Sequence, residues 1–379
     1  MGDTGGKSSM RCATKTENFW RLYIHRPSQQ NRTGQASLCR ARISPTVSLN
    51  AFKLKPKPKT QKKLQASVQN TMLLSVQEAL LHGLLFLKVS AVQQESLGLK
   101  KCAELFKQMY GSSPEVLAHV WYDLMTTDVP NSMCDASDKT FGGYRRFLMA
   151  NCFLFGYPRN TSWLRILFFP IGEKETRGEP LWCWVKKIQA LLPTKIKFLD
   201  RFDDDDPYTE LFIIGVDGTD CKTWERQHEV FPMDRKMMSH KFQHAAWKYE
   251  VGVAIYENKI VWVNGPFPGG RHDLTIFRED GLKDRMPNGK IAIVDRGYNT
   301  SKPDEVNTLA RPQIGDDPEM HRFMSRVRCR TETVMGRLKN FACLSGTFRH
   351  GEEKHEWSFK ACAVLVQYQI DHGAYLYEV

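Results

Sequence analysis

The sequence lacks the patterns of several common protein classes. It holds ten cysteines in 379 residues, yet no two of them form a CxxC pair, so the spacing of a zinc knuckle is missing and no disulfide framework is indicated. Reduced thiols in an intracellular protein are the natural interpretation. His240 and His244 have a zinc-ligand spacing but lack the glutamate of HExxH. The nucleophile motifs of serine and cysteine hydrolases are missing as well.

Long apolar runs are also missing. The N-terminus has no apolar core of the signal-peptide type. The most apolar stretch, 72–92, is interrupted by Gln77, Glu78, His82 and Lys88, which makes it a poor membrane span. We predict a buried helix there and no membrane association.

Acidic residues are scarce in the first 70 residues, which hold 14 Lys or Arg against two acids, Asp3 and Glu17. The net charge of +12 belongs to this segment, because residues 71–379 hold 40 charges of each sign. Lysine alternates with proline within 53–63, which disfavours a helix. We predict a disordered basic arm over 1–70 that binds a polyanion, with DNA as the expected partner and the nucleus as the expected location. A tail that only confers solubility is the alternative.

The region 71–206 follows mostly helical patterns and predicts a mainly α-helical domain. Within it, 98–125 is typical of two helices around a tight turn, where Gly111 ends the first helix and Pro114 begins the second. The second helix is expected to carry an apolar stripe of Leu117, Val120, Trp121 and Leu124. This pair is compatible with a DNA-binding helix-turn-helix. An ordinary helical hairpin fits equally well, since the second helix has no arginine. The acidic run at 203–206 predicts a solvated linker.

From residue 207 the pattern changes to strands, which predicts an α/β fold for 207–379. Two apolar stretches, 210–219 and 290–299, are expected to be strands that end on Asp217 and Asp295; a hairpin is predicted between them. Because the carboxyl ends of neighbouring strands converge in such folds, both carboxylates should share one crevice. They would repel each other unless a proton or a cation intervened, and hard oxygen ligands suit Mg²⁺ or Mn²⁺.

A third carboxylate is expected on a basic helix predicted over 321–341. Glu332 lies there, away from the apolar stripe that includes Val327 and Val334. An ion pair with Arg328 would stabilise the helix by about 0.2–0.5 kcal/mol and is the simpler alternative. A metal-ligand role for Glu332 would account for a lone carboxylate among cations that hold phosphates. These cations are Arg326, Arg328, Arg330, Arg337 and Lys339.

Several stretches together resemble a known family: VDGTDCKTWE, PFPGGRHDLTIF, IVDRGYNT and RTETVMGRLKNF, with ACAVLVQYQIDHG near the end. They look like the PIF/Harbinger type of DDE-superfamily transposases and endonucleases. The resemblance covers roughly 210–373. It implies an RNase H-like catalytic domain, a divalent metal cofactor (Mg²⁺ or Mn²⁺), and cleavage and transfer of DNA strands.

Carried over by motif, the resemblance implies a catalytic triad of Asp217, Asp295 and Glu332, with Asp273 as a further metal ligand. Asp273 also precedes an apolar stretch, so capping of a helix is the alternative. The family has a small residue after the second aspartate, whereas this chain has Arg296.

Because of that departure, a transposase-derived DNA-binding protein without catalysis stays open beside the active enzyme. A nuclease that cuts without transferring strands is a third interpretation. The cations of the basic helix are expected to line the DNA path. A separate DNA-binding protein and a second copy of this chain are further candidate partners.

Overall fold

The computed structural model describes residues 73–159, 179–198, 211–224, 235–279, 281–302, 305, 308–313 and 315–379. The chain divides into two units, Met1–Gln69 and Asn70–Val379, and the described residues belong to the second. The predicted basic arm, the acidic run at 203–206 and the predicted domain boundary lie outside the described residues, as does the side chain of Arg296.

The first part of the second unit is helical, as predicted. Its helices are α3 (Val76–Phe86), α4 (Ala91–Tyr110), α5 (Pro114–Thr126), α6 (Asp128–Ser132), α7 (Phe141–Gly156), α9 (Glu179–Gln189) and α10 (Leu192–Lys195). The apolar stretch near 72–92 forms α3, whose Ala79 and Leu84 are buried. Within the described residues, none of the helices combines the length and apolar character that crossing a membrane requires.

The predicted helical pair is present in α4 and α5. Gly111 follows α4 with a φ of 78°, a left-handed conformation that glycine adopts without a steric penalty. Ser113 caps α5 by accepting a hydrogen bond from the N–H of Val116 (3.3 Å). The predicted apolar stripe is fully buried, namely Leu117, Val120, Trp121 and Leu124. The helix α5 contains no Lys or Arg that could contact DNA phosphates. The described contacts do not test DNA binding, so the helix-turn-helix stays a prediction.

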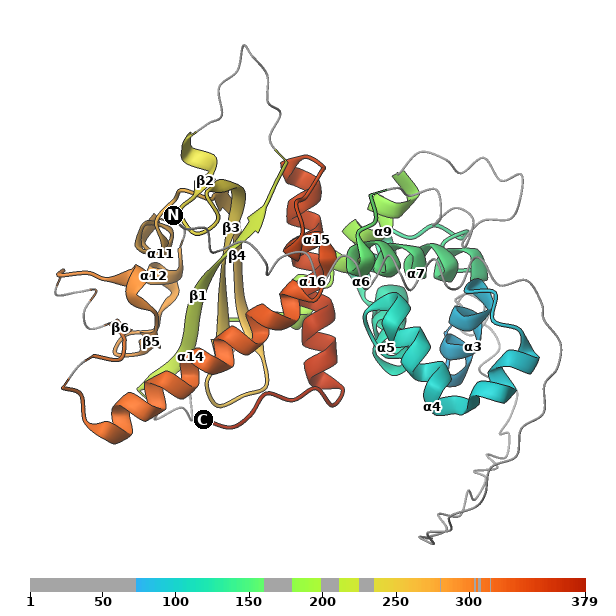
Figure 1. Ribbon diagram of the computed structural model, residues 1–379, viewed down its shortest axis with the longest axis horizontal. Coiled ribbons are helices and arrows are strands. Elements are labelled where there is room, and N and C mark those ends of the chain that lie inside the picture. Colours follow the sequence, from blue (N-terminus) through green and yellow to red (C-terminus); the bar gives the residue numbers. More distant parts are fainter. Residues whose placement is uncertain are drawn as a thin grey trace, which may run out of the picture. The chain divides into compact units, whose positions relative to one another are not determined.

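The second part of the unit contains a mixed sheet, which confirms the α/β class (Figure 1). Its strands are β1 (Phe212–Lys222), β2 (Met238–Ser239), β3 (His244–Ala254), β4 (Ile260–Pro268), β5 (Ile291–Ile293) and β6 (Leu309–Ala310). β3 lies between β1 and β4 and is antiparallel to both. On the other side of β1, β5 and β6 continue the sheet in the parallel direction. The expected hairpin is thus confirmed as β3 and β4.

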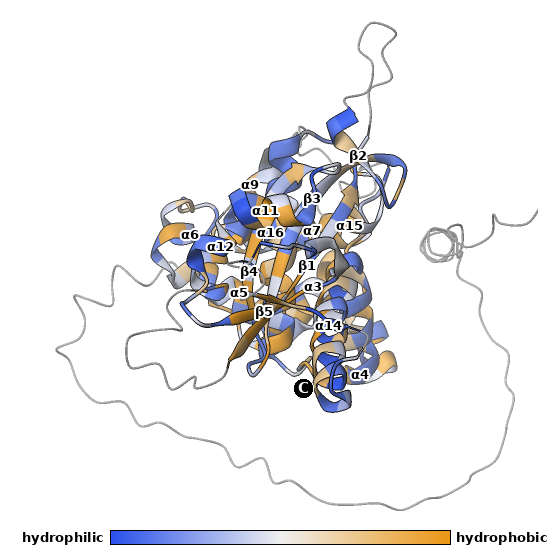
Figure 2. Cartoon of the chain, turned by 90° about the vertical axis from the view of Figure 1, so that its left-hand side faces the viewer, coloured by the Kyte–Doolittle hydropathy of each residue, from blue (hydrophilic) through white to orange (hydrophobic). Residues whose placement is uncertain are grey.

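Helices cover both faces of this sheet. On one face, α11 (Asp273–Glu279) and α12 (Leu282–Arg285) share a core with the hydrophobic strands β1 and β5 (Figure 2). On the other face, α14 (Pro318–Lys339) crosses β1. Gly215 makes this crossing close, because a Cβ atom there would lie 2.6 Å from Thr331 Oγ1.

The closing helix α16 (Glu352–Asp371) follows the short α15 (Ala342–Ser345) and is mostly buried. It packs against β4 as well as against α5 and α9. Gln367 Oε1 accepts a hydrogen bond from the N–H of Ile260 in β4 (2.7 Å). The Tyr368 hydroxyl donates to Asp123 Oδ2 in α5 (2.5 Å). This helix therefore joins the sheet to the helical part of the unit.

Candidate active site

Asp217 and Asp295 are neighbours because β1 and β5 are parallel neighbours. Gly215 of β1 pairs with Ile293 of β5, and each aspartate follows two residues later. The expectation that each strand ends on its aspartate is wrong, because β1 continues to Lys222 through its pairing with β3, and β5 ends at Ile293. Asp217 therefore lies inside β1, at the point where the parallel pairing with β5 stops and the antiparallel pairing with β3 continues.

The Asp217 carboxyl group lies in surroundings that oppose its ionisation. Burial, and then the negative charges of Asp295 and Asp273, raise its pKa to about 7. A hydrogen bond that its Oδ1 accepts from the N–H of Gly218 (2.8 Å) and the charge of Lys241 act in the opposite direction. Near neutral pH this site therefore binds a proton or gains from a cation, as carboxylates at close quarters do.

The Asp273 carboxylate lies against Gly218, which follows Asp217, and Gly297, which comes two residues after Asp295. A Cβ atom at Gly218 would be 2.5 Å from Asp273 Oδ1, and one at Gly297 would be 2.7 Å from Asp273 Oδ2. The same Cβ atom at Gly297 would also be 2.9 Å from Asp295 Oδ1. The glycines of VDGT and VDRGY thus leave the space that Asp273 occupies beside the other two aspartates.

Asp273 does not take the capping position of α11, which was the alternative role. His272 does so, because its carbonyl oxygen accepts from the N–H groups of Thr275 (3.0 Å) and Ile276 (3.1 Å). Asp273 is the first residue of the helix. Its Oδ1 accepts a hydrogen bond from Lys248 Nζ (3.1 Å).

The sequence did not single out Lys248. Lys248, on β3, pairs across the sheet with Asp220 of β1, and its ammonium group is also 3.9 Å from the Asp220 carboxylate. The ammonium group offsets part of the negative charge of the cluster. The sequence does carry a signal for Lys248. Lys248 and Glu250 are two residues apart in a mostly apolar strand, and this spacing puts both side chains on one face of the sheet.

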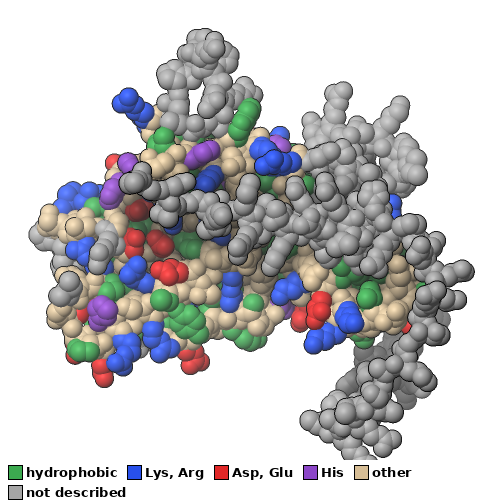
Figure 3. All heavy atoms as spheres, viewed as in Figure 1, with side chains coloured by type: hydrophobic (Ala, Val, Ile, Leu, Met, Phe, Trp, Pro, Cys, Tyr) green, Lys and Arg blue, Asp and Glu red, His purple; other side chains and the backbone are tan. Residues whose placement is uncertain are grey.

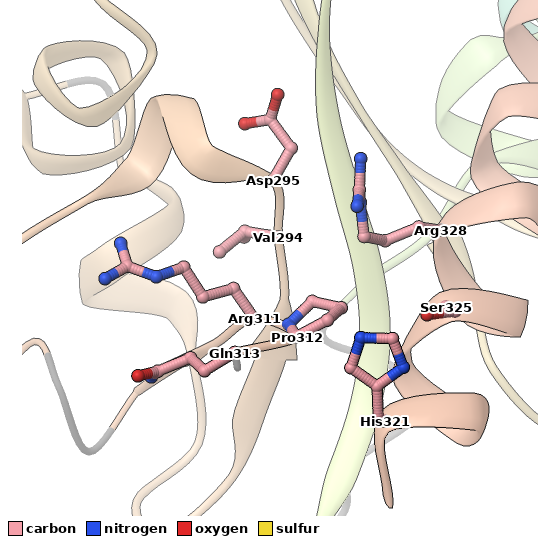
Figure 4. Close-up of a pocket in the computed structure, with 8 residues that line it drawn as sticks. All are labelled: Val294, Asp295, Arg311, Pro312, Gln313, His321, Ser325 and Arg328. Carbon is pink, nitrogen blue, oxygen red and sulfur yellow. The ribbon is translucent and has the colours of Figure 1, made fainter. Parts of the chain in front are cut away.

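The structure does not place Glu332 with the three aspartates. Its side chain is 61% exposed, and Oε1 lies 3.9 Å from Arg328 Nη2, which is the ion pair predicted as the simpler alternative. Arg328 also lines a pocket of about 180 Å³ together with Asp295, His321 and Ser325. In Figure 4 the Asp295 carboxylate and the Arg328 guanidinium point toward the same end of that pocket. Arg328 therefore neighbours Asp295 across the pocket and Glu332 along the helix.

Residues 216–367 match the model of a protein family described as DDE superfamily endonuclease. This match supports the DDE transposase superfamily. It includes Asp217, Asp273, Asp295 and Glu332, and it spans less than half of the chain. Among curated proteins and solved structures, none matches the chain. A DDE superfamily endonuclease suggests a nuclease or transposase with DNA as its substrate, and such enzymes generally use divalent metals.

Five cations of α14 were predicted to contact DNA, and three of them hold the C-terminal segment instead. Arg330 is 3% exposed. It donates to the carbonyl oxygens of Ala254 (3.2 Å), Glu257 (2.5 Å) and Tyr377. A contact between this guanidinium and DNA would require the C-terminal segment to leave the helix. The other two donate to nearby carbonyls: Arg337 to Ala374 and Tyr375, and Arg326 to Glu378.

Lys339 also has partners within the chain. Its ammonium group donates to the carbonyl oxygens of Asp220 (2.6 Å) and Leu344 (3.0 Å), and it lies 3.0 Å from Cys221 Sγ. Arg328 differs, because it and Asp295 line the same pocket. On the face shown in Figure 3, acidic side chains gather near β1 and α11 with cations around them. Of the five predicted DNA-binding cations, Arg328 is therefore the one whose position fits a phosphate beside the aspartates.

Proposed function

We propose that this protein is a metal-dependent DNA endonuclease that cleaves and transfers DNA strands, in the manner of PIF/Harbinger-type transposases. The observation that carries the proposal is the crowding of Asp217, Asp273 and Asp295 where the parallel pairing of β1 and β5 stops. The strand arrangement supports an RNase H-like fold for 207–379, since antiparallel β1, β3 and β4 are extended on the β1 side by parallel β5 and β6.

In donor chemistry the three aspartates fit a hard divalent cation such as Mg²⁺ or Mn²⁺; their ligand oxygens do not all lie within 4.8 Å of one another in the described state, so a bound ion would draw the side chains closer together. They offer oxygen donors, and the pKa of Asp217 is raised first by burial and then by the negative charges of Asp295 and Asp273, which a bound cation would offset. In phosphodiester cleavage, divalent ions supply activation of the attacking hydroxyl and stabilisation of the leaving oxygen. Asp217, Asp273 and Asp295 would hold them.

The chain's own groups prepare this site. Backbone N–H groups of Gly218 and Gly297 donate to one oxygen of Asp217 (2.8 Å) and of Asp295 (2.7 Å), which orients both carboxylates. Asp217 has to give up its proton to act as an ionised ligand, so cation binding and proton release are coupled.

Glu332 is the third carboxylate of the proposed triad. Gly215 contacts Thr331, the residue before Glu332, and Asp217 lies on the same face of β1 as Gly215 because strand side chains alternate. Arg328 would release Glu332 when a DNA phosphate takes its guanidinium, which binds phosphate well. The expected location is the nucleus, and base specificity would come from the helical region or from a separate DNA-binding protein.

A transposase-derived DNA-binding protein without catalysis is the second candidate. The observation in its favour is that Glu332 is largely exposed and pairs with Arg328 (3.9 Å) in the described state.

A cleavage assay separates the candidates. The substrate is a labelled duplex that carries the ends of the element encoding the chain, incubated with Mn²⁺ or with EDTA. We expect cut strands in Mn²⁺ and, with target DNA added, joined products. Cleavage without joining would indicate a nuclease. Binding of the duplex without cleavage, in Mn²⁺ and in Mg²⁺, would favour the non-catalytic protein.

A further inference from the structure

A second group of metal-ligand side chains lies at the end of α16, on residues that the proposed nuclease reaction does not use. Glu115 and His119 are four residues apart on α5 and therefore share one face of that helix. His372 directly follows α16. One donor atom from each of the three residues lies within 4.8 Å of the others.

The three side chains already contact one another. The rings of His119 and His372 are stacked with their centroids 4.1 Å apart and an interplanar angle of 20°. His372 Nδ1 is 3.9 Å from Glu115 Oε1. The stacked rings would turn about their side-chain torsions to bring two imidazole nitrogens and one carboxylate oxygen to a common point, over a starting separation of at most 4.8 Å.

The backbone that carries these residues is held by hydrogen bonds between α16 and the start of α5. Gln369 Nε2 donates to the carbonyl oxygen of Gly111 (3.0 Å) and to Ser112 Oγ (2.8 Å). The N–H of His372 donates to the carbonyl oxygen of Tyr368 (3.0 Å). Ligands held on a fixed framework bind an ion with a smaller loss of conformational entropy.

The electrostatic surroundings favour a neutral imidazole. Burial, and then the neighbouring His119, lower the pKa of His372, while Glu115 and Asp371 oppose this shift and Lys195 adds to it. Metal ions bind the neutral form of histidine. Lys195 is paired with the Asp123 carboxylate (2.9 Å), so part of its repulsion toward a cation is offset.

We propose that Glu115, His119 and His372 form a transition-metal site, with Zn²⁺ as the expected ion. Two imidazole nitrogens and one carboxylate oxygen suit Zn²⁺, with bonds of about 2.0–2.2 Å and a fourth position for water. This donor set differs from that of the aspartate cluster, which suits Mg²⁺ or Mn²⁺. The bound ion links α5 to the end of α16 and thereby stabilises the folded unit.

Metal binding by the full-length chain tests this site. The Asp217→Asn, Asp295→Asn double variant serves as the background, since it removes the main competing carboxylates. Co²⁺ replaces Zn²⁺ as a coloured probe, and its visible absorption reports nitrogen ligands in a site of low coordination number. We expect one site per chain, and Zn²⁺ should displace the Co²⁺ and raise the melting temperature.

On this background His119→Ala and His372→Ala should each weaken Co²⁺ binding at least tenfold and abolish the Zn²⁺-dependent rise in melting temperature. Glu115→Gln, which keeps the shape of the side chain, should weaken binding less. His240→Ala removes an exposed histidine elsewhere and should change neither readout. Unchanged Co²⁺ spectra and affinity in a His119→Ala, His372→Ala double variant would overturn the site, and this outcome would leave the proposed nuclease activity unaffected.

Discussion

The aspartate cluster and the cations of α14 differ in how far their charges are satisfied within the chain. Asp217, Asp273 and Asp295 lie close together, and burial with mutual repulsion raises the pKa of Asp217 to about 7. Arg330, by contrast, lies buried with its donors on backbone carbonyl oxygens. Buried carboxylates with too few cations nearby to balance their charge indicate a ligand site. A buried cation whose donors have acceptors within the chain indicates a structural role.

The largest expected effect concerns the aspartates. Asp217→Asn or Asp295→Asn should lower the rate of strand cleavage by roughly 10³-fold or more, which corresponds to about 4 kcal/mol of the barrier, because the amide removes charge that a divalent cation requires. DNA binding should persist. Asp284→Asn, an exposed acid on α12, is the matched control and should cut normally. Wild-type rates in either aspartate variant would refute the assignment.

The second prediction concerns the pH dependence of stability without divalent metal. The pKa of Asp217 is raised to about 7 in the folded state, and it is about 3.9 in an unfolded chain. The folded state therefore holds this proton more tightly than the unfolded state. The free energy of unfolding should fall as the pH rises from about 4 to about 7, by up to about 4 kcal/mol. Denaturant unfolding of wild type and Asp217→Asn across this range measures the difference. Identical pH profiles would show that Asp217 ionises without cost.

A pair of arginine variants tests the contrast within α14. Arg330→Ala should lower the free energy of unfolding by about 2–4 kcal/mol, because buried carbonyl oxygens lose their donor. Arg328→Ala should change it by less than about 1 kcal/mol, since its ion pair is exposed, but should weaken DNA binding. Denaturant unfolding and a DNA-binding titration provide the two readouts. Equal losses of stability in both variants would remove the distinction between the two arginines.

The smallest predicted loss of activity follows from Glu332. Glu332→Gln should change the free energy of unfolding by less than about 1 kcal/mol, because an exposed ion pair contributes little. Cleavage should nevertheless fall by about tenfold to a hundredfold, or about 1.4–2.7 kcal/mol of the barrier, if DNA frees this carboxylate for the triad. Cleavage at the wild-type rate would leave Glu332 as a partner of Arg328 alone.

Local patterns in the sequence were sufficient for much of the fold. Glycine and proline positions predicted the turn between α4 and α5, and apolar periodicity predicted the buried stripe of α5. Two apolar stretches followed by acids predicted that Asp217 and Asp295 would be neighbours, and the pairing of β1 with β5 confirms it. Such features follow from the sequence because each depends on residues within one element, or on the general rule that parallel strands align their carboxyl ends.

Tertiary structure alone decided which partner each charged side chain has. Arg330 meets the carbonyl oxygen of Tyr377, and Lys339 meets that of Asp220, although these partners lie far apart in the sequence. The same holds for Asp273 with Lys248 and for His119 with His372. Periodicity shows which face of an element is buried, but a long polar side chain reaches whatever group the packing of distant elements places beside it, and that packing is not encoded in any local pattern.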